Sequence, residues 1–168
     1  MGWSPDGQQI VYNSEKGDPR GTASYGDPST AEIYVIQADG SNLRKLTDNR
    51  AIDLCPSWSP DGKHIAFYSN RDRDLNYTGD KIFSSKGPGA FQIYIMQADG
   101  QQVQRLTNTT ANDITPAWSP DGSRIAFASD RDGNLEIYVM NADGSQPTRL
   151  TDLPGLDLAP VWNPVITP

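Results

Sequence analysis

Three aspartates recur in one register and are the residues of this chain best suited to hold a cation. Asp53, Asp113 and Asp157 each lie six residues after the Thr of a Leu-Thr pair and three residues before a Pro. Carboxylate oxygens are the ligands that Ca²⁺ prefers, so a ring of these side chains at a channel mouth could hold Ca²⁺ or a cationic group of a ligand. Alternatively, each Asp accepts backbone N–H bonds within its own loop. The sequence leaves both hypotheses open.

Two segments, residues 15–32 and 70–92, have the composition of a recognition surface. They are rich in Gly, Pro, Ser and charged residues, yet they also carry aromatic side chains beside arginines, which is typical of binding surfaces. The other interpretation is that these rings pack beneath their own loops. The candidate partner-binding residues are Tyr25, Arg71, Arg73, Tyr77, Phe83 and Phe91.

Few residues of this chain could carry out catalysis. His64 is the only histidine, and we expect it at the solvated start of a strand. The sequence contains no G-x-S-x-G elbow, no H-E-x-x-H motif and no P-loop. We therefore predict no catalytic residues and no enzymatic activity.

Charge and hydropathy exclude two classes of partner. A net charge of −7 argues against nucleic acid, because neutralising phosphates needs clustered Lys and Arg. No apolar run approaches the roughly 18 residues that span a bilayer, so we expect no membrane insertion. Cys55 is the single cysteine, which rules out an intrachain disulfide.

The elements that must position these residues follow from an internal repeat. The string Trp-Ser-Pro-Asp-Gly begins at Trp3, Trp58 and Trp118, and a degraded copy begins at Trp162. Each copy continues with an apolar triplet, an Ile-Tyr pair, an Ala-Asp-Gly turn and a Leu-Thr pair. After insertions of about 11 and 16 residues in the first two copies are removed, the period is about 44 residues, within the range of propeller blades.

Each repeat reads as a four-stranded antiparallel meander. The triplets are rich in β-branched and aromatic residues, and Gly supplies the positive φ that tight hairpins need. The first strand ends at Trp and the fourth at Leu-Thr. Successive connections in a meander alternate between ends, so both insertions share one face with the loops that follow Leu-Thr. We call it the insertion face, and we call the face carrying the Trp-Ser-Pro-Asp-Gly and Ala-Asp-Gly turns the turn face.

The fold class is thus all-β, with three propeller blades per chain. The predicted blades cover residues 2–53, 54–113 and 114–156, followed by a closing strand at 157–163, all within one domain of 1–168.

The repeat read from residues 118 to 151 resembles that of the TolB-type β-propeller family. This resemblance covers essentially the whole chain and implies a six-bladed propeller, a role in protein–protein binding, and a periplasmic or other extracytoplasmic setting in the cell envelope. Propellers of similar kind accompany peptidase domains, and a carbohydrate lyase built on the propeller would be the enzyme alternative.

Three blades do not close a ring, since propellers have four to eight. A four-stranded face measures roughly 17 Å by 19 Å, and two seams between two half-rings would cover about 1,200 Å² of projected face. We therefore predict a homodimer that completes six blades.

Three hypotheses about function follow. The favoured one is a non-catalytic interaction module that binds a protein or peptide at the insertion face. The alternatives are a self-assembling fragment of a longer propeller protein and a metal-binding propeller with Ca²⁺ in its central channel.

Overall fold

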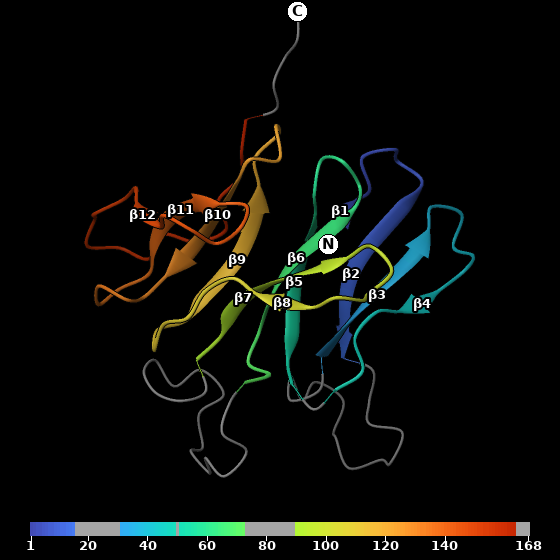
Figure 1. The fold of residues 1–168 in the computed structure, drawn as a ribbon, viewed down its shortest axis with the longest axis horizontal. Coiled ribbons are helices and arrows are strands. Elements are labelled where there is room, and N and C mark those ends of the chain that lie inside the picture. Colours follow the sequence, from blue (N-terminus) through green and yellow to red (C-terminus); the bar gives the residue numbers. More distant parts are fainter. Residues whose placement is uncertain (16–30, 50, 73–89, 164–168) are drawn as a thin grey trace, which may run out of the picture.

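The computed structural model describes residues 1–15, 31–49, 51–72 and 90–163, which fold into three four-stranded antiparallel sheets (Figure 1). Each sheet is a meander of four consecutive strands. The first contains β1 (Gly2–Trp3), β2 (Gln9–Glu15), β3 (Ala31–Gln37) and β4 (Arg44–Lys45). The second contains β5 (Asp53–Trp58), β6 (His64–Ser69), β7 (Gln92–Gln97) and β8 (Gln104–Arg105). The third contains β9 (Asp113–Trp118), β10 (Arg124–Ser129), β11 (Glu136–Asn141) and β12 (Thr148–Arg149).

The predicted all-β architecture with three blades is confirmed, with two differences at its boundaries. β5 and β9 begin at Asp53 and Asp113, one residue before the predicted starts of the second and third blades. The expected closing strand at 157–163 is not a strand in the structure, because no neighbouring strand in the described part of the chain pairs with it. Across the described residues we find no helical segment with the length and hydropathy of a transmembrane span.

The core lies between adjacent sheets. Val11, Ile33 and Val35 of the first sheet pack with Trp58 and Phe67 of the second in one cluster of buried residues. A further cluster joins the second and third sheets and includes the residues Ala66, Tyr68, Phe91, Ile93, Ile125, Phe127, Tyr138 and Met140. The middle sheet is covered on both faces, which explains why β6 is apolar along most of its length and does not alternate.

The innermost strands β5 and β9 contain a β-bulge before their prolines. The register of β5 against β6 shifts between Leu54 and Ser57, and Cys55 has a φ of 48°. Thr115 has a φ of 52° at the equivalent place in β9. Since Pro cannot donate to a strand ladder, a bulge is where a sheet tolerates it.

The aspartates of the Trp-Ser-Pro-Asp-Gly turns are turn formers. Asp61 accepts hydrogen bonds from the Ser59 hydroxyl (2.6 Å) and the backbone N–H of Lys63 (3.0 Å), and Gly62 follows with a φ of 69°. These bonds favour the ionised carboxylate, and the one from Ser59 contributes most to lowering the pKa of Asp61.

Replacing Trp58 by Ala should lower the free energy of unfolding by about 3–5 kcal/mol, as for other buried aromatic side chains. Trp58 is 9% exposed between the first two sheets, whereas its repeat equivalent Trp3 is 59% exposed. Val103→Ala, at an apolar side chain that is 40% exposed between β7 and β8, is the control and should cost below about 1 kcal/mol. Urea unfolding followed by circular dichroism measures both. Equal losses for the two variants would contradict the assignment of Trp58 to the core.

Candidate functional site: aspartate–arginine pairs at the insertion face

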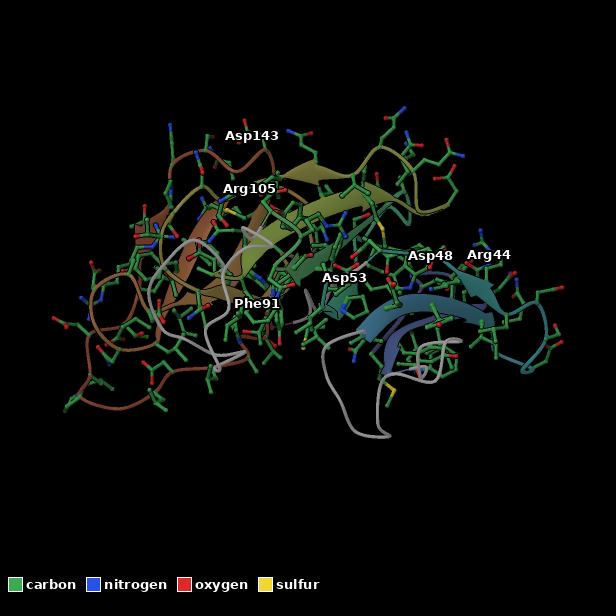
Figure 2. All side chains as sticks on the ribbon, turned by 90° about the horizontal axis from the view of Figure 1, so that it is seen from below. Arg44, Asp48, Asp53, Phe91, Arg105 and Asp143 are labelled. Atoms are coloured by element: carbon green, nitrogen blue, oxygen red, sulfur yellow. The ribbon has the colours of Figure 1, made fainter. Side chains whose placement is uncertain are left out.

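Asp53 begins β5 at the insertion face and is bound by an arginine that follows the end of the neighbouring strand β6. Arg71 follows β6, and its Nη2 atom lies 3.0 Å from each carboxylate oxygen of Asp53. Asn49 Nδ2 donates a third hydrogen bond to this carboxylate at 2.8 Å. Asp53 is 0% exposed, so its charge is compensated entirely within the protein (Figure 2).

The third sheet repeats this pair at the same register. Arg131 Nη2 lies 3.0 Å from Oδ1 of Asp113, which is also 0% exposed, and the Thr109 hydroxyl donates to Oδ2 at 3.0 Å. The guanidinium also stacks on Tyr138, 4.4 Å from the ring centroid, and its Nε donates to Ser129 Oγ at 2.9 Å. Carboxylate, aromatic ring and hydroxyl together hold the arginine in one orientation.

Asp157 lies at the same register but is not paired in this way. Its backbone N–H donates to the carbonyl of Leu135 at 2.8 Å, just as Asp113 donates to Phe91 at 2.8 Å. Its Oδ2 atom is buried and has no hydrogen-bond partner among the described residues. The local backbone of the repeat is thus kept at Asp157, which forms no ion pair with an arginine among the described residues.

The aspartates do not form a metal centre in the part of the chain that is described. No group of three or more His, Cys, Asp or Glu side chains gathers there with the spacing to hold an ion. The carboxylate oxygens of Asp53 and Asp113 already accept hydrogen bonds from arginine, asparagine and threonine side chains. The Ca²⁺ ring remains a prediction, and so does its alternative, because the donors to Asp53 and Asp113 among the described residues are side chains and not backbone N–H groups.

A second repeated bond, which the sequence reasoning missed, fixes the loops after Leu-Thr. The hydroxyls of Thr47, Thr107 and Thr151 donate to Glu32, Gln92 and Glu136, respectively. The sequence could have indicated these hydrogen bonds, because a Glu or Gln precedes each Ile-Tyr pair. Burial raises the pKa of Glu32, whereas the hydrogen bond from Thr151 lowers the pKa of Glu136.

The structure corrects two of the predicted partner-binding residues. Phe91 is 1% exposed and packs edge-on against Tyr68 with centroids 5.1 Å apart, so it belongs to the core between sheets (Figure 2). Arg71 turns inward to Asp53, because a buried carboxylate offers it a stronger partner than solvent does. The remaining candidates Tyr25, Arg73, Tyr77 and Phe83 lie outside the described residues.

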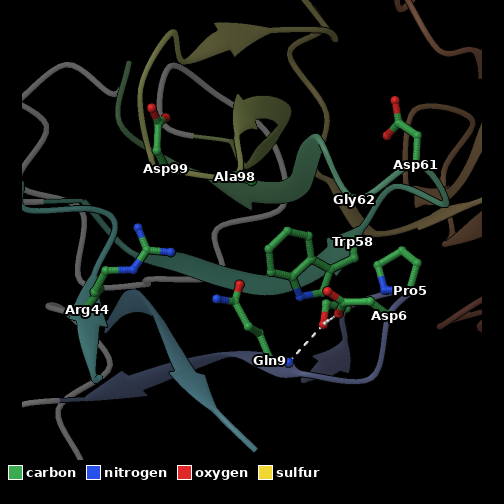
Figure 3. Close-up of a pocket in the computed structure, with 10 residues that line it drawn as sticks. Pro5, Asp6, Gln9, Arg44, Trp58, Asp61, Gly62, Ala98 and Asp99 are labelled. Carbon is green, nitrogen blue, oxygen red and sulfur yellow. Dashed lines mark hydrogen bonds between the residues drawn. The ribbon is translucent and has the colours of Figure 1, made fainter. Parts of the chain in front are cut away.

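A pocket of about 390 Å³ opens on the turn face between the first two sheets (Figure 3). Trp58 lines it together with Arg44 and two turn carboxylates, Asp61 and Asp99. An equivalent pocket of about 630 Å³ lies between the second and third sheets and includes His64 in its lining. These residues were not predicted from the sequence to line the space between blades.

Comparison with known proteins identifies the repeat. The family model of the TolB beta propeller domain matches residues 78–165. A TolB homolog of Chlorobium chlorochromatii is 32% identical over 151 residues, which are 74% of this chain and 32% of that protein. An uncharacterized peptidase of Bacillus subtilis is 29% identical over 128 residues, 73% of this chain and 16% of the relative.

Among solved structures, one described as a TolB protein of Agrobacterium tumefaciens superposes with a TM-score of 0.70 at 29% identity. The match covers 93% of this chain and 47% of that one. The chain therefore spans about a third of the Chlorobium relative and about half of the solved structure.

Arg131→Ala should lower the free energy of unfolding by about 3–5 kcal/mol, because it leaves the carboxylate of Asp113 buried and uncompensated. The matched control is Arg105→Ala, which removes a pair with Asp72 whose side chains are 30% and 53% exposed. Exposed pairs contribute little, so the control should lose below about 1 kcal/mol. Chemical denaturation gives both values, and a loss at Arg131 no larger than at Arg105 would show that the buried pair is not a structural clamp.

Proposed function

We propose a binding role from one premise, which is that this chain belongs to the TolB β-propeller domain family. In this proposal the chain is a non-catalytic interaction module, and it binds a protein or peptide at the insertion face. Its setting is extracytoplasmic, as the family resemblance implies.

The observation that carries the proposal is the rigid base from which the inserted segments depart. In the second sheet, Asp53 and Arg71 lock the start of β5 to the end of β6, directly before the long insertion. In the third sheet, Asp113 and Arg131 form the same lock where only residues 130–135 connect β10 to β11. One framework thus supports a long or a short loop, which is how recognition loops vary on a constant scaffold.

A binding role fits the chemistry of the insertion face better than catalysis does. A general acid or base must be free to exchange a proton with a substrate, whereas Asp53 and Asp113 are fully buried against arginine. His64 begins β6 and lines a pocket on the turn face, at the opposite end of the sheet. The peptidase relative is matched over only 16% of its length, so its activity is not carried over to this chain.

Self-association is the second part of the proposal. Three sheets make half of a six-bladed ring, and the chain covers 47% of the Agrobacterium structure that it resembles. Two copies would then present two insertion faces on the same side of one ring.

Deleting residues 73–88 tests the binding face. Peptides selected from a phage-displayed random library against the parent protein serve as the probe, and their affinity is measured by isothermal titration calorimetry. We expect the deletion to weaken these peptides at least tenfold, with the melting temperature changed by only a few degrees, because surface-loop length changes closure entropy slowly.

Arg44→Glu, at the pocket on the turn face, is the matched control and should leave affinity unchanged. Peptides that tolerate the deletion but lose affinity with Arg44→Glu would move the binding site to the turn face. A library that yields no binder would remove support for an interaction module.

A further inference from the structure

We propose that two copies of this chain dock head to tail, with Leu150 of each copy packed onto Gly40 of the other. The inference rests on the proposed six-bladed assembly and names the surfaces that would form it. Leu150 lies on the outer face of the third sheet, and Gly40 lies on the outer face of the first. We call these the Leu150 face and the Gly40 face.

The two contacts between neighbouring sheets within the chain show what each face fits. A Cβ atom placed on Gly100 of the second sheet would lie 2.7 Å from the backbone oxygen of Leu46 in the first. A Cβ atom on Gly144 of the third sheet would lie 2.6 Å from the backbone oxygen of Leu106 in the second. Both approaches are too close for any side chain, so each Leu packs onto the bare backbone of the next sheet's Ala-Asp-Gly turn.

Leu150 and Gly40 are the two unmatched halves of this contact. Leu46 is 9% exposed, whereas Leu150 is 59% exposed. Gly40 has a φ of 84°, like the other turn glycines, and a Cβ atom there would meet nothing within 4 Å. The backbone N–H of Leu150 donates to Ile137 at 2.7 Å, as that of Leu46 donates to Ile33 at 2.8 Å, so the local conformation is the same. Each face is therefore already shaped for the other.

A second repeated contact, between a Pro of one sheet and a Gly of the next, also supports head-to-tail docking. Pro5 lies 3.7 Å from a Cβ atom built on Gly62, and Pro60 lies 3.7 Å from one built on Gly122. Gly7 has an open position on the Gly40 face, and Pro120 is exposed on the Leu150 face. Both contacts run from a residue of one sheet to a glycine of the next, so the two outer faces are complementary to each other and not to themselves.

The Leu150 face is also apolar beyond Leu150. Leu153, Leu156 and Leu158 are 64%, 69% and 48% exposed in the segment that follows it. On the Gly40 side, Trp3 is 59% exposed at the register where Trp58 is buried against the preceding sheet. Apolar side chains grouped in this way mark an interaction surface.

Head-to-tail docking of this kind forms a closed ring when the rotation returns to its start. Three sheets per copy give six after two copies, with two identical seams. At roughly 300 Å² for each face, the seams together cover about 1,200 Å², which reaches the lower range of stable protein interfaces. A second copy therefore matches the two outer faces in shape and in apolar character, and it would bury enough area for a stable interface.

Static light scattering of the parent protein at about 50 μM tests the assembly first. The expected mass is twice the chain mass of 18.4 kDa. Leu150→Asp places a charge in the seam and should give a monomer. Leu43→Asp, a Leu that is 53% exposed in the turn between β3 and β4, is the matched control and should leave the dimer intact.

Gly40→Asn tests the opposite face. Asn tolerates positive φ better than other residues with a Cβ atom, so the turn should persist while the new atom collides with the partner copy. Gly133→Asn, at another open glycine with positive φ, controls for backbone strain and should remain dimeric.

Mixing the two monomeric variants distinguishes this geometry from one in which like faces meet, Leu150 face on Leu150 face or Gly40 face on Gly40 face. Leu150→Asp keeps its Gly40 face and Gly40→Asn keeps its Leu150 face, so an equimolar mixture should form a dimer through one intact seam, at least tenfold tighter than either variant alone. Should either variant fail to fold, a Cys55→Ser background carrying Leu150→Cys in one copy and Ser41→Cys in the other should crosslink with a short bismaleimide.

The possible results of these experiments test the assembly and the head-to-tail contact separately. A monomeric parent would overturn both the six-bladed assembly and this inference. A dimer that survives Leu150→Asp, or variants that do not complement or crosslink, would overturn the head-to-tail contact alone. Neither result would touch peptide binding at the insertion face, which the deletion of residues 73–88 tests separately.

Discussion

The spacing of the sheets depends on one contact, in which the backbone of a Leu lies against the glycine of a turn in the next sheet. Gly100 approaches Leu46 so closely that a Cβ atom would lie 2.7 Å from its carbonyl oxygen. This approach lets Trp58 and Phe67 bury themselves against the first sheet. A larger residue at Gly100 would separate the sheets along their outer edge and open the core, because interiors tolerate few voids.

The turn face and the insertion face are held by different kinds of interaction. On the turn face, short bonds such as that from Ser59 to Asp61 close tight hairpins within a few residues. On the insertion face, Arg71 reaches Asp53 across eighteen positions and joins the start of β5 to the end of β6, directly before the long insertion. The charge is buried there, so the pair gives one fixed geometry directly before the loop whose length varies between the sheets.

Periodicity was sufficient to predict the architecture, since strand order, turn positions and the number of sheets all follow from spacing. It was not sufficient to predict which side chains are free. Phe91 lies at the end of an inserted segment of surface-like composition, yet it fills the core, because Tyr68 on the neighbouring strand offers it an apolar partner. The aspartates were recognised by their register, but their arginines were not, although Arg71 and Arg131 recur at one spacing.

The predicted closing strand shows a further limit of local sequence. Residues 157–163 carry the pattern of an innermost strand, and Ala159 has the φ of 52° that marks the bulge in β5 and β9. A strand also needs a neighbour, and the pattern of one segment does not say where that neighbour comes from. The backbone conformation of this segment could therefore be predicted from the sequence, whereas the strand that pairs with it could not.

This preformed segment changes the energetics of assembly. Asn134 Nδ2 lies 3.0 Å and 2.6 Å from the carbonyl oxygens of Leu153 and Gly155, and Thr151 donates to Glu136 at 2.6 Å. These bonds order the loop that leads to Asp157 within a single copy. Association loses affinity when loops must be ordered at the interface. Because the third sheet already holds its own outer loop, docking would draw mainly on the burial of Leu150 and its apolar neighbours.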